Sequence, residues 1–356
     1  MSVLPEFPPV LPPDEDVLEH ALSARNALPP EYGVPPRSLG RLESLGAWMS
    51  ACQGQLPPRQ LHEVRLIVVA GEHGIAQRQP EISALPSSFT ADAMSAIIDG
   101  RAPLISAASA AGIFVSLVDA TSARPSGSID VEDAMSEAEL GEHLRHGMAI
   151  ADTEADKGTQ LLLLGDLGRG LTTVAAAVIG SICGIEPVKV VGWGSGIGDS
   201  AWRVKTGAIR DAMYRVRDDR ADAHRVLQRI GSPDLAVLTG ILAQSAVRRT
   251  PVLIDGLGVA AAALCAQILA PGAAAWWVAG SLGEEPAHLP ALKALHLEPL
   301  LSVGIGTGQG LGAILALPLL RQAVDTLSAG APDDPLAPES VGEVKEAVSG
   351  DSATDN

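Results

Sequence analysis

Aromatic side chains are scarce in this sequence and make up only 3% of its 356 residues. Because 47% of the residues are nevertheless hydrophobic, the core has to be built from alanine, leucine, valine and isoleucine. Basic residues are also few, with 25 lysines and arginines against 42 acidic residues and a net charge of −17. Nucleic-acid binding requires clustered cations that neutralise phosphates. The composition therefore argues against a nucleic-acid surface, although backbone N–H groups can still hold one small phosphate.

Cysteine pairs, metal-ligand spacings and membrane-length apolar runs are missing too. Cys52, Cys183 and Cys265 lie far apart, and we expect them to be reduced core residues. No grouping of His, Cys, Asp or Glu has zinc spacing, so we expect neither a metal nor a cofactor. The longest apolar run that we identify, 256–270, is shorter than a membrane span, and the sequence MSVLPEFPPV lacks the parts of a secretory signal. We expect a soluble, cytoplasmic protein with no membrane partner.

Short apolar runs that end near glycine alternate with helical patterns along most of the chain. We predict strands at 64–70, 112–119, 161–164, 187–191, within 248–256 and at 274–279. We predict helices at 38–51, 137–156, 172–181, 200–217, 235–247 and 260–269, and a further one after the loop that begins at Val303. Such alternation is typical of βαβ units. The sequence therefore predicts an α/β fold with a doubly wound, mostly parallel sheet and helices on both faces.

The composition changes towards both ends of the chain. Residues 1–35 are rich in proline and acid and are expected to form an extended arm that packs only in parts. Residues 36–330 would form the α/β domain, with a smaller helical part made from the N- and C-terminal segments. Residues 331–356 are rich in proline and acid without periodicity, and we expect them to be disordered.

Glycine-rich turns follow several predicted strands, and parallel strands end at one edge of a sheet. We therefore expect one crevice to collect the turns after Ala70, Leu164, Val191 and Ala279. GDLGRGLTT (165–173) combines three glycines with paired hydroxyls at a helix start, as phosphate binding requires, although Thr172 can also be a simple N-cap. GWGSGIGD (192–199) repeats this chemistry, and Lys205 on the next helix is either a phosphate cation or a solvated lysine. Neither motif is a Walker A or dinucleotide sequence.

Two further motifs carry polar groups. VGIGTGQGLG (303–312) places glycines at every second position around one polar side chain, Gln309, before an apolar helix. This loop is either a site or an ordinary helix N-terminal turn. GEHG (71–74) places Glu72 and His73 at the end of the first predicted strand, where an acid and an imidazole can bind or shuttle a proton. A lone histidine is otherwise often a hydrogen-bonded structural residue.

Eight segments of the sequence match, in the same order, segments of one known family. The matching segments are PPRSLGRLE (35–43), VVAGEHGI (68–75), SALPSSFTADAM (83–94), LLGDLGRGLTTVAAAVI (163–179), VVGWGSGIGDSAW (190–202), AVRRTPVLIDG (246–256), AGSLGEEPAH (279–288) and LSVGIGTGQGLGAILALP (301–318). Over about residues 20–328 the chain resembles nicotinate-nucleotide:dimethylbenzimidazole phosphoribosyltransferases of the cobalamin lower-ligand pathway. The resemblance implies a homodimeric enzyme that moves phosphoribose from nicotinate mononucleotide to dimethylbenzimidazole or a related aromatic base. The products would be nicotinate and α-ribazole phosphate.

The resemblance also implies the residues of the site. Gln309 stands at the position of the family's general-base glutamate, and Asp166 is our second catalytic candidate. The substrate-binding candidates are Glu72, His73, Gly168, Gly170, Thr172, Thr173, Gly192, Ser195, Gly196, Asp199, Lys205, Gly280, Ser281, Gly308 and Gly310.

Departures from the family pattern fall at these same positions. An amide cannot accept a proton at neutral pH, so Gln309 lacks the function of the glutamate. Leu171 replaces the asparagine of Gly-Asn-Thr-Thr, Glu72 replaces an aspartate, and Ser281-Leu282 replaces a His-Arg pair. Two hypotheses follow. The chain is a working phosphoribosyltransferase that handles the proton by another group, or it is an impaired paralogue that binds nucleotide or pairs with an active subunit.

Overall fold

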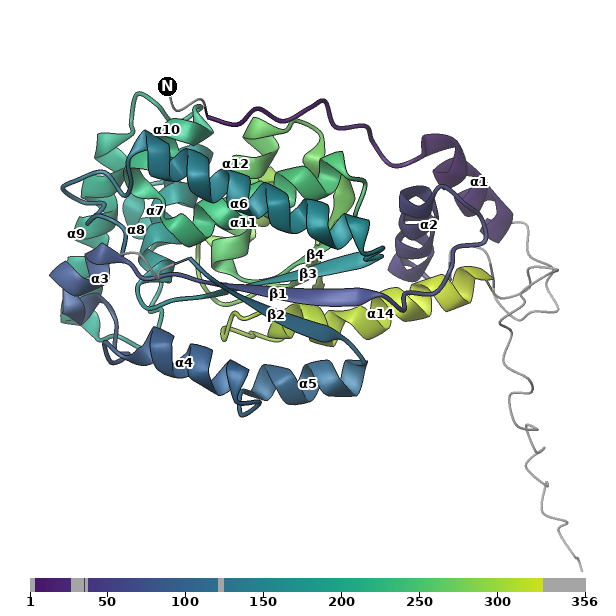
Figure 1. Ribbon diagram of the computed structural model, residues 1–356, viewed down its shortest axis with the longest axis horizontal. Coiled ribbons are helices and arrows are strands. Elements are labelled where there is room, and N and C mark those ends of the chain that lie inside the picture. The colour runs from purple at the N-terminus through teal and green to yellow at the C-terminus, as the bar shows by residue number, and fades with distance from the viewer. Residues whose placement is uncertain (1–3, 27–34, 36–37, 121–124, 329–356) are drawn as a thin grey trace, which may run out of the picture.

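A single parallel sheet organises the fold (Figure 1). The computed structural model describes residues 4–26, 35, 38–120 and 125–328, so the predicted disordered tail at 331–356 lies outside the described residues. The strands are β1 (Val64–Ala70), β2 (Phe114–Asp119), β3 (Leu161–Leu167), β4 (Val252–Ile254), β5 (Trp277–Ser281) and β6 (Pro299–Leu301). Their order is β2-β1-β3-β4-β5-β6, and every neighbouring pair is parallel. The predicted α/β fold is confirmed.

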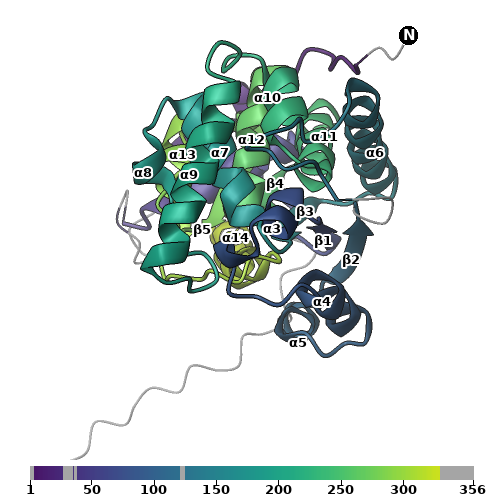
Figure 2. The same ribbon diagram turned by 90° about the vertical axis from the view of Figure 1, so that its left-hand side faces the viewer.

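Helices cover both faces of the sheet, which explains why the central strands are apolar at nearly every position. Ile67, Val69 and Leu164 point into one core, whereas Leu66 and Leu163 point into the other. The first face is covered by α6 (Glu137–Asp156), α7 (Leu171–Cys183), α10 (Ala223–Ile230), α11 (Pro233–Val247) and α12 (Leu257–Leu269). The second is covered by α2 (Arg41–Gln53), α4 (Phe89–Ile98), α5 (Pro103–Ala111) and α14 (Leu311–Ser328), and Figure 2 shows the two layers from the side.

Segments from both ends of the chain meet at one side of the molecule. Helix α1 (Glu15–Asn26) packs on α2, and α2 packs on α14 (Figure 1). The predicted extended arm at 1–35 thus contains a helix, which the proline-rich composition around it did not indicate. The remaining elements are α3 (Gly74–Arg78), η2 (Pro80–Ile82), α8 (Pro187–Val190), α9 (Asp199–Arg215), η3 (Ala273–Trp276) and α13 (His288–Ala294).

Two predicted strands need correction. The strand predicted at 187–191 is wrong, because Pro187–Val190 forms the short helix α8. Proline fits the first turn of a helix, and Val188 is exposed instead of facing a neighbouring strand. The strand predicted at 274–279 starts only at Trp277, since Ala273–Trp276 is a 3₁₀ turn. The sequence patterns also missed α4, α5, α10, α13 and β6.

Helix α14 has 18 residues and is longer than the apolar run at 256–270, which the sequence analysis identified as the longest. Within the described part of the chain it alone is long and apolar enough to cross a membrane by length and composition. One face of this helix, with Leu317, Leu320 and Val324, is buried in the second core. Packing within the protein therefore accounts for its apolar composition.

The contact between α6 and α11 depends on two glycines. A Cβ at Gly147 would lie 2.1 Å from the carbonyl oxygen of Val237, and one at Gly240 would lie 2.3 Å from that of Leu144. Both obstacles are backbone atoms, so the helices would have to separate to admit a methyl group.

We therefore predict that Gly147→Ala destabilises the protein by about 1–3 kcal/mol. Gly207 on α9 is the matched control, because a Cβ there meets nothing within 4 Å. Gly207→Ala should instead stabilise by up to about 1 kcal/mol through helix propensity. Chemical denaturation of both variants measures the difference, and equal stabilities would contradict the packing argument.

Candidate functional site

A cavity of about 720 Å³ lies at the carboxyl ends of β3 to β6. Its walls are the turns that follow these strands, at 166–172, 255–258, 283–288 and 304–309, together with residues from the segments 82–89 and 191–195. Ligand sites of open parallel sheets lie at this edge, and the volume suits a nucleotide-sized ligand. The predicted turns after Leu164, Val191 and Ala279 do meet here.

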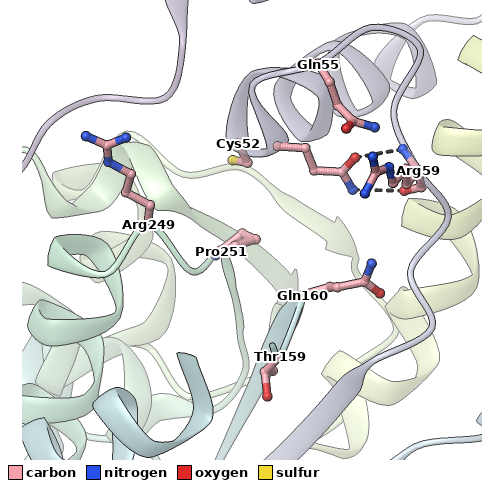
Figure 3. Close-up of a pocket in the computed structure, with 8 residues that line it drawn as sticks. Cys52, Gln55, Arg59, Thr159, Gln160, Arg249 and Pro251 are labelled. Carbon is pink, nitrogen blue, oxygen red and sulfur yellow. Dashed lines mark hydrogen bonds between the residues drawn. The ribbon is translucent and has the colours of Figure 1, made fainter. Parts of the chain in front are cut away.

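A second hollow, of about 230 Å³, lies at the opposite edge of the sheet. Figure 3 shows its wall, where Gln160 and Pro251 precede β3 and β4 and the side chain of Arg249 points away from the other labelled residues. Cys52 stands here, and burial raises its thiol pKa well above the ordinary value. A thiol of raised pKa is a poor nucleophile. We therefore place the candidate site in the larger cavity.

The first part of the site is a corner formed by two glycine turns, which we name the anion-binding corner after the role that the sequence predicts for it. Gly170 (φ 90°) precedes α7, and Gly194 (φ 49°) lies in the turn before α9. Behind them Lys205 is fully buried, and its Nζ donates to Thr172 Oγ1 at 2.9 Å and to the carbonyl oxygen of Gly192 at 3.2 Å. Burial lowers the pKa of Lys205, and the nearby Glu285 offsets part of this effect. The alternative that Lys205 is a solvated lysine is wrong.

The segment after β5 supplies a carboxylate to this corner. Oε1 of Glu285 accepts a hydrogen bond from the Gly194 N–H at 2.8 Å. A Cβ at Gly192 would lie 2.2 Å from Glu285 Oε2, so a larger residue at that position would require the Glu285 side chain to move. The sequence patterns did not identify Glu285, although the AGSLGEEPAH motif contains it.

The second part of the site is the buried carboxyl group of Asp166. Its Oδ2 accepts hydrogen bonds from the N–H groups of Gly258 (2.7 Å) and Val259 (3.1 Å) at the start of α12. Burial raises the pKa of Asp166 to about 7; the nearby Asp255 adds to the increase, and the two hydrogen bonds oppose it. A carboxyl group with this pKa can take up a proton near neutral pH.

The loop before α14 lies directly on this carboxyl group. The backbone N–H of Gln309 donates to the backbone carbonyl oxygen of Asp166 at 2.9 Å, and Gln309 is one of the residues that line the cavity. Gln309 adopts φ 59°, which is uncommon for a residue with a side chain. A Cβ at Gly165 would lie 2.2 Å from the Gln309 backbone. The loop can therefore approach β3 this closely only because residue 165 is glycine.

Asp255 holds the start of α14 in place. Its Oδ1 accepts a 2.5 Å hydrogen bond from Ser281 Oγ, and its Oδ2 accepts one from the Gly312 N–H at 2.8 Å. Burial raises the pKa of Asp255 above the ordinary value despite these bonds. Ser281, which we predicted to bind substrate, instead holds Asp255 and does not line the cavity.

His288 adds a neutral imidazole to the wall after β5. Its Nδ1 accepts a hydrogen bond from the Gly283 N–H at 3.1 Å, and burial lowers its pKa to about 4. The imidazole is therefore uncharged at neutral pH, with its other nitrogen protonated.

The turn after β1 does not contribute to the cavity wall, contrary to our expectation for all four turns. His73 is fully buried, with Nε2 3.4 Å from Asp234 Oδ1 and Nδ1 2.9 Å from the Arg169 carbonyl oxygen. Burial alone would lower the pKa of His73, but Asp234 and these contacts raise it overall, and the pKa of Asp234 is lowered by the same pairing. His73 is a buried ion-pair partner, the structural alternative that the sequence left open.

The predicted residues thus divide into two groups. The cavity wall includes Asp166, Gly168, Gly170, Thr172, Gly192, Ser195, Gly308 and Gln309. The wall does not include Glu72, His73, Thr173, Gly196, Asp199, Lys205, Gly280, Ser281 and Gly310. Over the described ranges, no three His, Cys, Asp or Glu side chains group as metal ligands.

Arg169 is a further residue that the sequence patterns missed. Its guanidinium is buried and donates to the carbonyl oxygens of Ala76 (2.6 Å), Pro80 (2.8 Å) and Leu85 (2.9 Å). Ser195 Oγ holds the same segment by accepting from the Ala84 N–H at 2.8 Å. Arg169 and Ser195 therefore position the cavity wall at 82–89.

Known proteins are similar to this chain in sequence and in fold along nearly its whole length. A family model described as Phosphoribosyltransferase matches residues 11–332. The nicotinate-nucleotide–dimethylbenzimidazole phosphoribosyltransferase of Corynebacterium glutamicum (strain ATCC 13032) is 46% identical over 340 residues, which cover 91% of this chain and 93% of that protein. The protein of the same name from Mycobacterium avium (strain 104) is 44% identical over 337 residues, covering 91% and 95%. A crystal structure of CobT from Thermus thermophilus matches with a TM-score of 0.82 and 31% identity, covering 88% of this chain and 96% of that one. The chain therefore belongs to the nicotinate-nucleotide–dimethylbenzimidazole phosphoribosyltransferase family, which confirms the resemblance of its motifs.

Proposed function

We propose that this chain transfers phosphoribose from nicotinate mononucleotide to dimethylbenzimidazole or a related aromatic base. The observation that carries the proposal is the combination, in one cavity, of an anion-binding corner and a buried carboxyl group with a pKa of about 7. The names of the relatives support the same reaction.

The corner formed by Thr172, Gly194 and Lys205 would hold the phosphate. It offers the Thr172 hydroxyl, the positive end of the α7 dipole, and a buried ammonium group close behind them. The rest of the described cavity wall contains three acidic side chains, Asp166, Asp255 and Glu284, and no lysine or arginine. A negative wall stabilises the positive charge that develops on the ribosyl carbon as nicotinate leaves.

Asp166 would accept the proton of the incoming base. One benzimidazole nitrogen attacks the ribosyl carbon, and the bond from that carbon to the nicotinate nitrogen breaks with its electron pair going to nicotinate. The other benzimidazole nitrogen must lose its proton, and the Asp166 carboxylate can take it. Attack from the side opposite the leaving group inverts the ribosyl carbon, as an α-linked product requires.

The impaired-paralogue hypothesis rests on the departures from the family pattern, of which Gln309 is the one at the position of the general base. It is the weaker candidate because Asp166, directly beside the Gln309 loop, already offers a group suited to the proton transfer. Both hypotheses are tested by incubating the purified protein with nicotinate mononucleotide and a panel of aromatic bases. The proposal requires nicotinate and an α-linked ribotide in equal amounts, and binding without turnover would favour the impaired paralogue.

We propose that the protein is a cytoplasmic homodimer, on the basis of the family resemblance. Exposed apolar side chains on one layer, including Ile98, Leu315 and Leu319, offer a surface for a second copy. Light scattering should give twice the 36.6 kDa of the single chain, and a mass of one chain under dilute conditions would count against a dimer.

Replacing the proposed proton acceptor gives the first test of mechanism. Asp166→Asn should lower kcat by about 10²–10⁴-fold, because the amide cannot take the proton. Asp166→Glu keeps a carboxyl group and is the matched control, which should lose less activity. Steady-state kinetics with saturating substrates measures both, and an Asn variant as active as wild type would exclude Asp166 as the base.

A stability measurement shows whether the Asn variant is folded. Burial raises the folded-state pKa of Asp166 to about 7 from an ordinary value of 3.8, so between these values the folded chain binds more protons than the unfolded chain. Ionisation of Asp166 therefore lowers stability as the pH rises through this window. By calorimetry at pH 8, Asp166→Asn should have a Tm no lower than that of wild type.

Restoring the family's glutamate tests the role of Gln309. If Asp166 carries the proton, Gln309→Glu should change turnover by less than about tenfold, since the base is already present. The introduced charge would also raise the pKa of Asp166 and shift the activity towards higher pH. A gain well above tenfold, measured with nicotinate mononucleotide and dimethylbenzimidazole, would show that Gln309 is a lesion.

A further inference from the structure

One donor of the anion-binding corner, the Gly194 N–H, already contacts a negative group within the chain. Glu285 Oε1 accepts the Gly194 N–H at 2.8 Å, and Oε2 lies over Gly192, where a Cβ would approach it to 2.2 Å. Carboxylate and phosphate oxygens seek the same donors. The Glu285 carboxylate therefore lies where an oxygen of a bound phosphate would lie.

The charge of Glu285 also acts on the cation of this corner. The Lys205 ammonium donates to the neutral oxygens of Thr172 and Gly192, and Glu285 is the group whose charge favours its protonated form. A phosphate held in the corner would supply the same charge to Lys205. Both anions together would repel each other in a largely buried space.

This internal contact gives a hydrogen bond to only one of the two oxygens of the Glu285 carboxylate. Glu285 Oε2 is buried and has no hydrogen-bond partner among the described residues. A buried, unpaired carboxylate oxygen costs free energy, whereas a phosphate has more acceptor oxygens to share among the N–H groups and hydroxyls of the corner. The contact is therefore one that a phosphate monoester can replace.

We infer that Glu285 is an internal competitor for the phosphate subsite, and that a phosphate monoester binds fully only after this side chain has left the Gly192–Gly194 turn. The inference rests on the proposed function for the identity of the subsite. The inference also concerns the part of the cavity near Asp166 and Gln309, where the aromatic base would bind. Glu284 packs on Gly304, where a Cβ would lie 2.9 Å from Glu284 Oε1. Movement of the segment 283–286 would thus reach the loop that carries Gln309.

Titration with inorganic phosphate tests this inference. Glu285→Gln keeps the size of the side chain and removes its charge, and Glu285→Ala removes the side chain. If the closed form holds about nine-tenths of the molecules, each variant should bind phosphate about tenfold more tightly than wild type. Glu284→Gln is the matched control, since it makes the same charge change one residue earlier without touching the Gly192–Gly194 turn, and its gain should be smaller.

Calorimetry gives the affinities, and the fluorescence of Trp193, which lies within that turn and is 52% exposed, gives an independent signal. If Glu285 only braces the turn, Glu285→Ala binds phosphate more weakly than wild type, and the inference is overturned. Equal gains in Glu284→Gln and Glu285→Gln, or no phosphate binding by any variant, overturn it too.

Turnover of nicotinate mononucleotide by the same preparations separates this inference from the proposed function. If wild type is active but the Glu285 variants bind phosphate no more tightly than wild type, only the inference that Glu285 competes with phosphate is contradicted. Tighter phosphate binding by the variants without any transfer contradicts the proposed reaction alone.

Discussion

The burial of the Asp166 carboxyl group is the constraint on which the site depends. Three segments meet on it: the end of β3, the first turn of α12, and the loop before α14. Their approach is so close that a Cβ at Gly256, Gly258 or Gly308 would fall 2.5–2.8 Å from an Asp166 oxygen. The same enclosure that excludes water also raises the pKa of the carboxyl group to about 7. The proposed proton transfer requires the charged form of this side chain, whereas burial in the folded protein disfavours that form.

Other polar groups, most of them buried, hold the segments of the cavity wall in position. Arg169 and Ser195 hold the segment 82–89, Asp255 holds the start of α14, and the His73–Asp234 pair lies behind the β3–α7 turn. Each connects segments that are far apart in the sequence. The wall is consequently built from several turns whose relative positions are set by hydrogen bonds to backbone atoms, which is how an open sheet edge can become a defined site.

Sequence patterns predicted the parallel sheet because strands buried on both faces are apolar at nearly every position, as Val64–Ala70 shows. They failed at Pro187–Val190, where a short β-branched run with proline forms a helix instead. The glycine turns indicated the cavity, since close backbone approach requires glycine and the glycines can be recognised in the sequence. The roles of Glu285 and Arg169 could not be recognised in this way, because their hydrogen-bond partners lie 91 and 84–93 residues away. His73 matched a proton-shuttle pattern but is paired with Asp234, a contact that no local pattern predicts.

The pH dependence of kcat/KM for transfer from nicotinate mononucleotide tests the central claim most directly, because it reports the ionisation of essential groups in the free enzyme. If Asp166 is the proton acceptor, kcat/KM rises with pH through an apparent pKa near 7, and this inflection disappears in Asp166→Asn. If Asp166→Asn keeps the wild-type value of kcat/KM and shows the same inflection near pH 7, the account is contradicted.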